Sequence, residues 1–71
     1  MGATQDHLAQ AVRDLAAARD RVEQQQRVIA TLQAHGHDTT TAESLLETML
    51  QTVRTMEDHR RVILKELGLA D

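Results

Sequence analysis

The chain of 71 residues has no cysteine, no proline and no aromatic residue, and it has only three glycines. Without cysteine, it can form no disulfide, no thiolate nucleophile and no cysteine-based metal site. Without Phe, Tyr or Trp, it lacks the flat side chains on which single-strand nucleic-acid binders stack bases. Without proline and with so little glycine, it also lacks most of the turns that a β-rich fold requires.

The residues that are present favour helices. Hydrophobic residues make up 41% of the chain and charged residues 27%, and Ala, Leu, Gln, Glu and Arg are prominent. These five residue types are strong helix formers. A chain this short has room for one small core. We therefore predict an all-α fold with a single domain.

The charge balance is mildly acidic, because 8 Lys and Arg face 11 Asp and Glu for a net charge of −3. A phosphate-binding surface needs a basic face, so a nucleic-acid partner is not expected. No apolar run approaches the roughly 20 residues needed to cross a bilayer, and the start of the chain lacks the layout of a signal peptide. We expect a soluble cytoplasmic protein without a membrane contact.

One break divides the helical pattern, at Gly36 and the residues that follow it. Glycine readily takes the left-handed conformation that ends a helix, and Asp38, Thr39 and Thr40 are residue types that begin one. Thr40 and Glu43 have the spacing of a capping box, with Asp38 or Thr39 as alternative caps. We predict a helix from about 4 to 35, a turn over 36–39 and a helix from about 40 to 67, which ends before Gly68.

Apolar residues recur with the three-and-four spacing of heptad packing in both predicted helices. We expect these residues to form the contact between the helices, called the seam below. Its large apolar members are Leu8, Leu15, Val22, Ile29, Leu32, Leu46, Met49, Val53, Met56, Ile63 and Leu67. The smaller members Ala11, Ala18 and Ala42 complete the two rows, together with the polar residues Gln25 and Arg60.

A short turn forces the two helices to run antiparallel, as in an antiparallel coiled coil. This arrangement predicts an ion pair between Arg19 and Glu57 beside the seam. Further apolar residues widen the stripe on both helices, namely Val12, Val28, Leu45, Leu50 and Leu64. A single hairpin would leave them uncovered, so we predict a homodimer that forms a four-helix bundle; a helix of another protein is the alternative partner.

The two polar residues on the seam have separate expectations. Gln25 is either buried, where it would fix the pairing of the helices, or turned outward to solvent, and the sequence favours neither. Arg60 is expected to lay its stem along the core and to place its charged group in water near Asp14.

No group of residues suggests catalysis, and we expect a protein that is not an enzyme and has no cofactor. His35 and His37 could hold a metal only with a third ligand, so we expect no metal site. His59 suggests a phosphotransfer hairpin, but it lies on the second helix and is followed by Arg60, and we expect a solvated helical residue instead. Arg54, Arg61 and Lys65 suggest a nucleic-acid binder of the shape of the plasmid copy-number regulator Rop, although the dipole of the helix already favours basic residues near its end.

The segment from Val28 to Leu67 resembles a group of short, uncharacterised bacterial helical-hairpin proteins. The residues that carry the resemblance are Ile29, Leu32, the turn Gly36-His37-Asp38-Thr39, Ala42, Leu45, Leu46, Met56, His59, Arg60 and Leu67. The resemblance implies a small standalone module or an appendage to signalling proteins, and it implies no activity. We therefore expect a structural or regulatory module that acts through helix–helix contacts.

Overall fold

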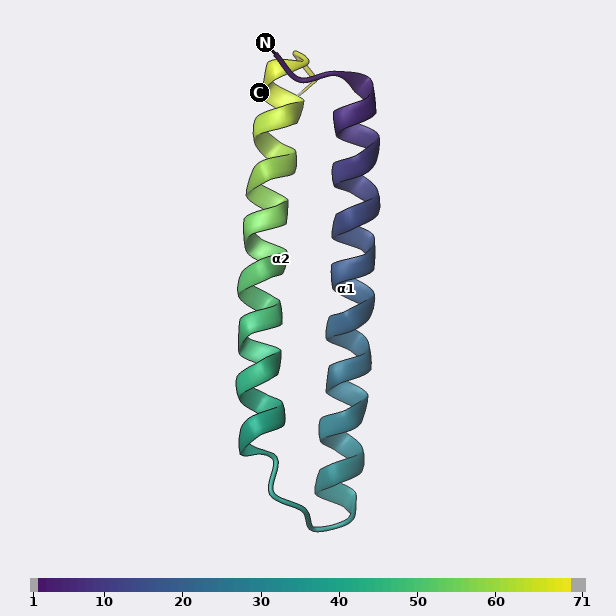
Figure 1. Ribbon diagram of the computed structural model, residues 1–71, viewed down its shortest axis with the longest axis vertical. Helices are drawn as coiled ribbons and strands as arrows, with labels where there is room; N and C mark the ends of the chain where they lie inside the picture. Colours follow the sequence, from purple (N-terminus) through teal and green to yellow (C-terminus); the bar gives the residue numbers. More distant parts are fainter. Residues whose placement is uncertain (1, 70–71) are drawn as a thin grey trace.

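The computed structural model describes residues 2–69, which form two long helices joined by a short turn (Figure 1). Helix α1 spans Gln5–Ala34 and helix α2 spans Thr40–Glu66. They run side by side in opposite directions in a hairpin of 51 × 19 × 15 Å. The helix ends lie within one residue of those predicted from the sequence. Over the described residues, neither helix is both long enough and apolar enough to span a membrane.

Helix α1 begins with a capping box that the sequence analysis did not identify. The hydroxyl of Thr4 accepts a hydrogen bond of 3.2 Å from the backbone N–H of His7, and Nδ1 of His7 accepts one of 3.3 Å from the N–H of Thr4. Two N–H groups that the first turn leaves unpaired are thereby satisfied. Just before this cap, the N–H of Ala3 donates to the Glu66 carboxylate at 2.8 Å, which joins the two helices at the open end of the hairpin.

Helix α1 ends in a Schellman motif centred on Gly36, which has a φ of 71°. The N–H of His37 donates to the carbonyl of Leu32 at 2.9 Å, and the N–H of Gly36 donates to that of Gln33 at 3.1 Å. These two bonds pair carbonyls that would otherwise be orphaned at the end of the helix. The prediction that Gly36 ends the first helix in a left-handed conformation is confirmed.

The same motif ends α2. Gly68 also has a φ of 71°, its N–H donates to the carbonyl of Lys65 at 3.0 Å, and the N–H of Leu69 donates to that of Leu64 at 2.8 Å. Both helices therefore stop where a glycine permits a backbone conformation that other residues rarely adopt.

The start of α2 corrects one of the alternatives left open by the sequence. Thr40 already lies inside the helix, so the capping box between Thr40 and Glu43 does not form. Thr39 occupies the cap position without a side-chain hydrogen bond, and the carboxylate of Asp38 accepts from the N–H of Thr40 at 2.9 Å and from its hydroxyl at 2.7 Å. These two hydrogen bonds lower the pKa of Asp38 below its ordinary value, and the bond from the hydroxyl has the larger effect.

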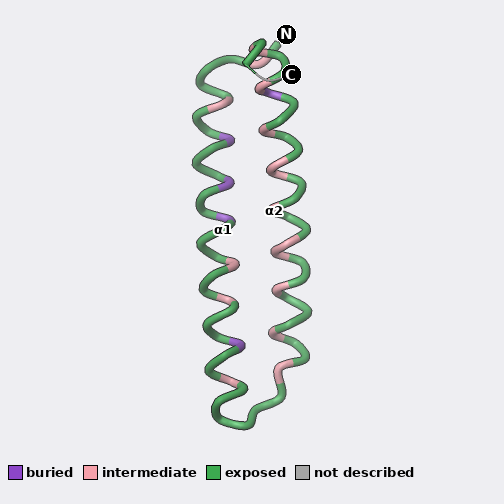
Figure 2. The backbone as a smooth tube through the Cα atoms, turned by 180° about the vertical axis from the view of Figure 1, so that it is seen from behind, coloured by how far each residue is buried: buried purple, intermediate pink, exposed green. Residues whose placement is uncertain are grey.

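Burial follows the predicted seam. All sixteen seam positions are buried or half-buried. Of the other residues in the two helices, only Leu50, Glu57 and Leu64 are half-buried, and the rest are exposed. Figure 2 shows these residues along the facing sides of the two helices, with exposed residues on the outer sides. The buried residues are Ala11, Leu15, Ala18, Ile29 and Ile63, and Leu15 alone among the described side chains is exposed by less than 2%. The hairpin therefore has a thin core, one residue deep.

Candidate interaction surface

An ion pair joins the helices on one side of the seam, where Arg19 also borders a hollow of about 240 Å³ with Val22, Glu23, Leu50 and Val53. Nη2 of Arg19 lies 3.1 Å from Oε2 of Glu57, as the antiparallel arrangement predicts. The two side chains are 52% and 37% exposed, so the pair contributes at most about 1 kcal/mol. Its main consequence is geometric, because it identifies which flanks of α1 and α2 meet on this side.

Gln25 turns its amide toward the other helix instead of toward solvent. Nε2 of Gln25 donates a hydrogen bond of 2.9 Å to the backbone carbonyl of Ala42, and the residue is half-buried. Of the two alternatives left open by the sequence, the inward one is therefore correct. A polar group on the seam that has a partner in the facing helix costs far less than an unpaired one.

Arg60 lies on the seam with its stem, as expected, and the first nitrogen of its guanidinium is buried there as well. The residue is half-buried on the seam, but its Nε is fully buried and has no hydrogen-bond partner among the described residues. The carboxylate of Asp14, its expected neighbour, instead accepts from Nε2 of Gln10 at 2.8 Å. The sequence pattern could place the stem of Arg60 on the seam, but it could not show how deeply the start of its guanidinium is buried.

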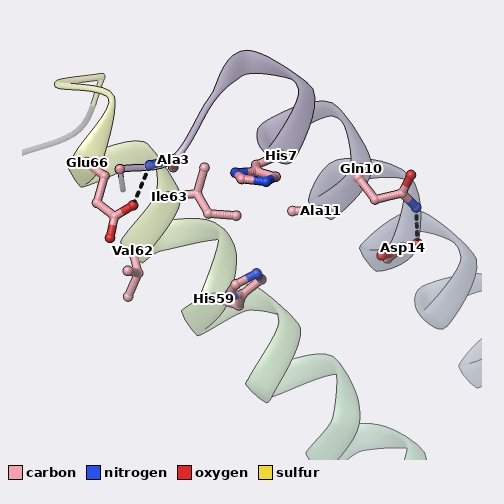
Figure 3. Close-up of a pocket in the computed structure, with 10 residues that line it drawn as sticks. Ala3, His7, Gln10, Ala11, Asp14, His59, Val62, Ile63 and Glu66 are labelled. Atoms are coloured by element: carbon pink, nitrogen blue, oxygen red, sulfur yellow. Dashed lines mark hydrogen bonds between the residues drawn. The ribbon is translucent and has the colours of Figure 1, made fainter.

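The other side of the seam is hollowed from the open end to about the middle of the hairpin, and we call this stretch the groove. Its central hollow has a volume of about 260 Å³ and is lined by Asp14, Ala17, Ala18, Arg21, Thr48, Met49, Thr52 and Met56. An end hollow of about 340 Å³, near the open end, is lined by Gly2, Ala3, His7, Gln10, Ala11, Asp14, His59, Val62, Ile63 and Glu66 (Figure 3). A third hollow of about 230 Å³ joins the two and is lined by Ala11, Asp14, Thr55, Met56 and His59. Asp14 borders all three.

The histidines lie in two separate places. His7 and His59, which come from different helices, both line the end hollow (Figure 3). His35 and His37 lie in the turn with their ring centres 6.2 Å apart, and Nδ1 of His35 donates to the carbonyl of Thr31 at 2.9 Å. Within residues 2–69, no three His, Asp or Glu side chains are grouped so that they could hold a metal ion.

The basic residues near the end of α2 are partly neutralised. Nη1 of Arg61 lies 2.8 Å from Oδ1 of Asp58, and both side chains are well exposed. Arg54 lies seven residues before Arg61 and seven after Glu47, so an acidic residue shares their side of the helix. Alternating signs of charge along one helix face are typical of a solvated surface rather than a phosphate-binding one.

Several large apolar side chains remain exposed outside the seam. Val12, Val28 and Leu45 are each 47% exposed, whereas Leu50 and Leu64, also expected on the flanks, are half-buried. Two more exposed apolar residues were not among those expected on the flanks: Val62 at 52% and Leu69, beyond the end of α2, at 57%. Val62 lines the end hollow of the groove. The exposed apolar surface is therefore partly gathered on the groove side.

Comparisons of the chain with protein-family models, with curated proteins and with solved structures found no match. The resemblance of the Gly36–Thr39 turn to bacterial helical-hairpin proteins therefore stays a prediction. The case for a function rests on the surface of the hairpin.

Proposed function

We propose that this protein is a non-enzymatic interaction module whose hairpin self-associates as a homodimer. Two hairpins would form a four-helix bundle in which heptad contacts, of the antiparallel coiled-coil kind, hold each hairpin and a second layer of contacts joins the two. The module would have a structural or regulatory role in the cytoplasm, either alone or as an appendage to signalling proteins. The resemblance of the turn to bacterial helical-hairpin proteins supports this role.

The observation that carries this proposal is the apolar surface outside the seam. Val12, Val28, Leu45 and Val62 are each about half exposed, although they lie within the helices. Single exposed apolar residues are ordinary, but three of these four, Val28, Leu45 and Val62, lie on the groove side, and such a cluster in so small a protein marks an interaction surface. Covering the exposed half of one such side chain contributes about 1 kcal/mol, so a partner must cover several of them at once to form a stable complex.

The total surface area supports the same proposal. The hairpin exposes 5324 Å², whereas a compact monomer of this mass exposes about 4,400 Å². The excess of about 900 Å² is close to the roughly 800 Å² that each partner buries in a standard protein interface. A second hairpin would therefore restore the surface area expected of a compact protein.

The concentration dependence of thermal unfolding tests this proposal. The helical signal in circular dichroism should melt at a higher temperature as the chain concentration rises from about 1 to about 100 µM, because association stabilises the folded state by mass action. A melting temperature that stays constant over this range, together with a monomeric mass, would contradict self-association. A helix of a different protein would then be the remaining way to cover the apolar surface.

A further inference from the structure

We propose that the groove is the surface on which the second copy docks, with Asp14 of each copy paired with Arg21 of the other. The two copies lie antiparallel about a two-fold axis that runs across the groove between these residues. Helix α1 then packs on α1 of the partner copy, and α2 packs on α2. This inference rests on the proposed self-association and adds the face, the direction and the charged pairs.

The first support is the charge at the two ends of the central hollow. Asp14 and Arg21 lie seven residues apart on α1, about 10 Å along the helix, and both line this hollow. Both are exposed, and the ion pairs of the hairpin join Arg19 to Glu57 and Arg61 to Asp58, so neither group has a charged partner among residues 2–69 of its own chain. A surface with one negative and one positive end is complementary to itself when rotated by 180°.

The space between the two charges suits a close approach of helices. Ala17 and Ala18 are the only residues of α1 that line the central hollow between its charged ends, and Met49 and Met56 line it from α2. Alanine lets the backbone of a second helix approach closely, and methionine adapts its shape to the neighbour that it meets. Thr48 and Thr52 also line the central hollow from α2, so the middle of the groove carries small or adaptable uncharged side chains between its two charged ends and can receive the same segment of another copy.

The same rotation also covers exposed apolar residues. Val28 lies seven residues after Arg21, and His7 lies seven residues before Asp14, so an axis that exchanges Asp14 and Arg21 also exchanges Val28 and His7. Val28 of one copy is thus placed over the end hollow of the other, which His7 lines.

Leu45 lies on the groove side of α2, because it comes seven residues before Thr52, which lines the central hollow. The rotation that places Val28 over the end hollow of the partner copy places Leu45 there too. The end hollow has a volume of about 340 Å³ and is bordered by the apolar side chains of Val62 and Ile63. The dimer therefore covers three exposed apolar residues of each copy, Val28, Leu45 and Val62, in addition to pairing the charges.

Charge reversal provides the test. In Asp14→Arg and in Arg21→Asp, both contacts bring like charges together, so each variant alone should dimerise at least tenfold more weakly than the wild type. An equimolar mixture of the two variants restores two opposite-charge pairs and should form a heterodimer. The double variant, which carries both changes, restores the same pairs and should form a homodimer. The matched controls are Arg13→Asp and Asp20→Arg, which make the same changes seven residues apart at exposed positions of α1 that border none of the hollows. Sedimentation equilibrium gives the mass of each sample, and circular dichroism confirms that the helices are intact.

The possible outcomes separate this inference from the proposed function. A wild-type protein that is monomeric at all concentrations overturns both. A dimeric wild type whose Asp14→Arg and Arg21→Asp variants dimerise as strongly as the controls overturns the groove as the interface and leaves self-association standing. Variants that stay monomeric when mixed overturn the antiparallel pairing.

A cysteine variant gives a second readout that does not depend on the charges. Ala17 lies beside the proposed axis, so two copies of Ala17→Cys should form a disulfide-linked dimer under an added oxidant. Ala16→Cys, at an exposed position that borders none of the three hollows, should cross-link at least tenfold more slowly. Equal rates for the two variants would contradict the proposed axis.

Discussion

The side-chain amide of Gln25 in α1 donates a hydrogen bond of 2.9 Å to the backbone carbonyl of Ala42 in α2. This is a contact between a polar side chain on the seam and the first turns of the facing helix. It ties the two helices together near the turn, while the bond from Ala3 to Glu66 ties them together at the open end. Most of the thin apolar core, including Ala11, Leu15, Ala18 and Ile63, lies between these two polar contacts, and Ile29 lies on the turn side of Gln25.

Gln25→Glu tests the contact directly. A carboxylate at this position cannot donate to the Ala42 carbonyl, so the variant should lose about 1–3 kcal/mol of stability at pH 7. The pKa of the introduced carboxyl is raised in the folded state, so the loss is complete above the folded pKa and disappears as the pH falls below the unfolded value of about 4.3.

The matched control for this variant is Gln24→Glu, which makes the same change at an exposed neighbour. Urea denaturation of both variants at pH 7 and at pH 4 makes the comparison. Equal stability of the two at pH 7 would show that the amide of Gln25 is not needed at the seam.

Val53→Asp tests the seam itself. Val53 is half-buried and lines a hollow with Val22, so an aspartate there must be desolvated or must separate the helices. The cost should be several kcal/mol, which is comparable to the whole stability of so small a fold. The control Gln51→Asp introduces the same charge at an exposed position.

The histidines should matter much less than the seam. His37→Ala and His59→Ala change exposed side chains and should alter the free energy of unfolding by well under 1 kcal/mol. Chemical denaturation of these variants beside Val53→Asp ranks the positions. If the histidine variants unfold while Val53→Asp stays folded, the heptad assignment is wrong.

Gly36→Val tests the end of α1. A Cβ added to Gly36 meets no atom within 4 Å, so the cost comes from the backbone, whose φ of 71° is unfavourable for a branched residue. The expected loss is about 1–3 kcal/mol. Gly36→Asn should lose less, because asparagine tolerates this conformation better. Equal melting temperatures for wild type and both variants would contradict the left-handed cap.

Asp38 provides a test by titration. Because the hydroxyl and the N–H of Thr40 both donate to its carboxylate, the pKa of Asp38 is lowered in the folded state. A carboxyl of this kind stabilises the fold above its unfolded pKa, and the stabilisation is lost as the pH falls through the folded value. Thr40→Val removes the hydroxyl and keeps the N–H, so an NMR titration should show the pKa of Asp38 moving part of the way back. An unchanged titration curve would show that the hydroxyl does not set this pKa.

The sequence predicted the helices because two independent signals agree. The seven-residue recurrence of apolar residues identifies the facing sides, and Gly36 and Gly68 mark the ends by a requirement that only the backbone imposes. The ion pair between Arg19 and Glu57 could be predicted for the same reason, since the turn fixes which residues of the two helices lie at the same height.

Other features depend on geometry that a pattern of residue types does not contain. His7 is an unusual partner for Thr4 in a capping box, so nothing in the residue types indicated that pair. The direction of Gln25 depends on whether a carbonyl lies within reach. The groove depends on how far the alanines of α1 stand from the side chains that they face on α2, which the heptad pattern does not give.

The mass of the wild-type protein in solution tests the central claim most directly. Sedimentation equilibrium at tens of micromolar should give about twice the chain mass of 7.9 kDa, and the value should fall toward that of the single chain on dilution. A well-folded helical protein that sediments as a 7.9 kDa monomer at every concentration would contradict the account.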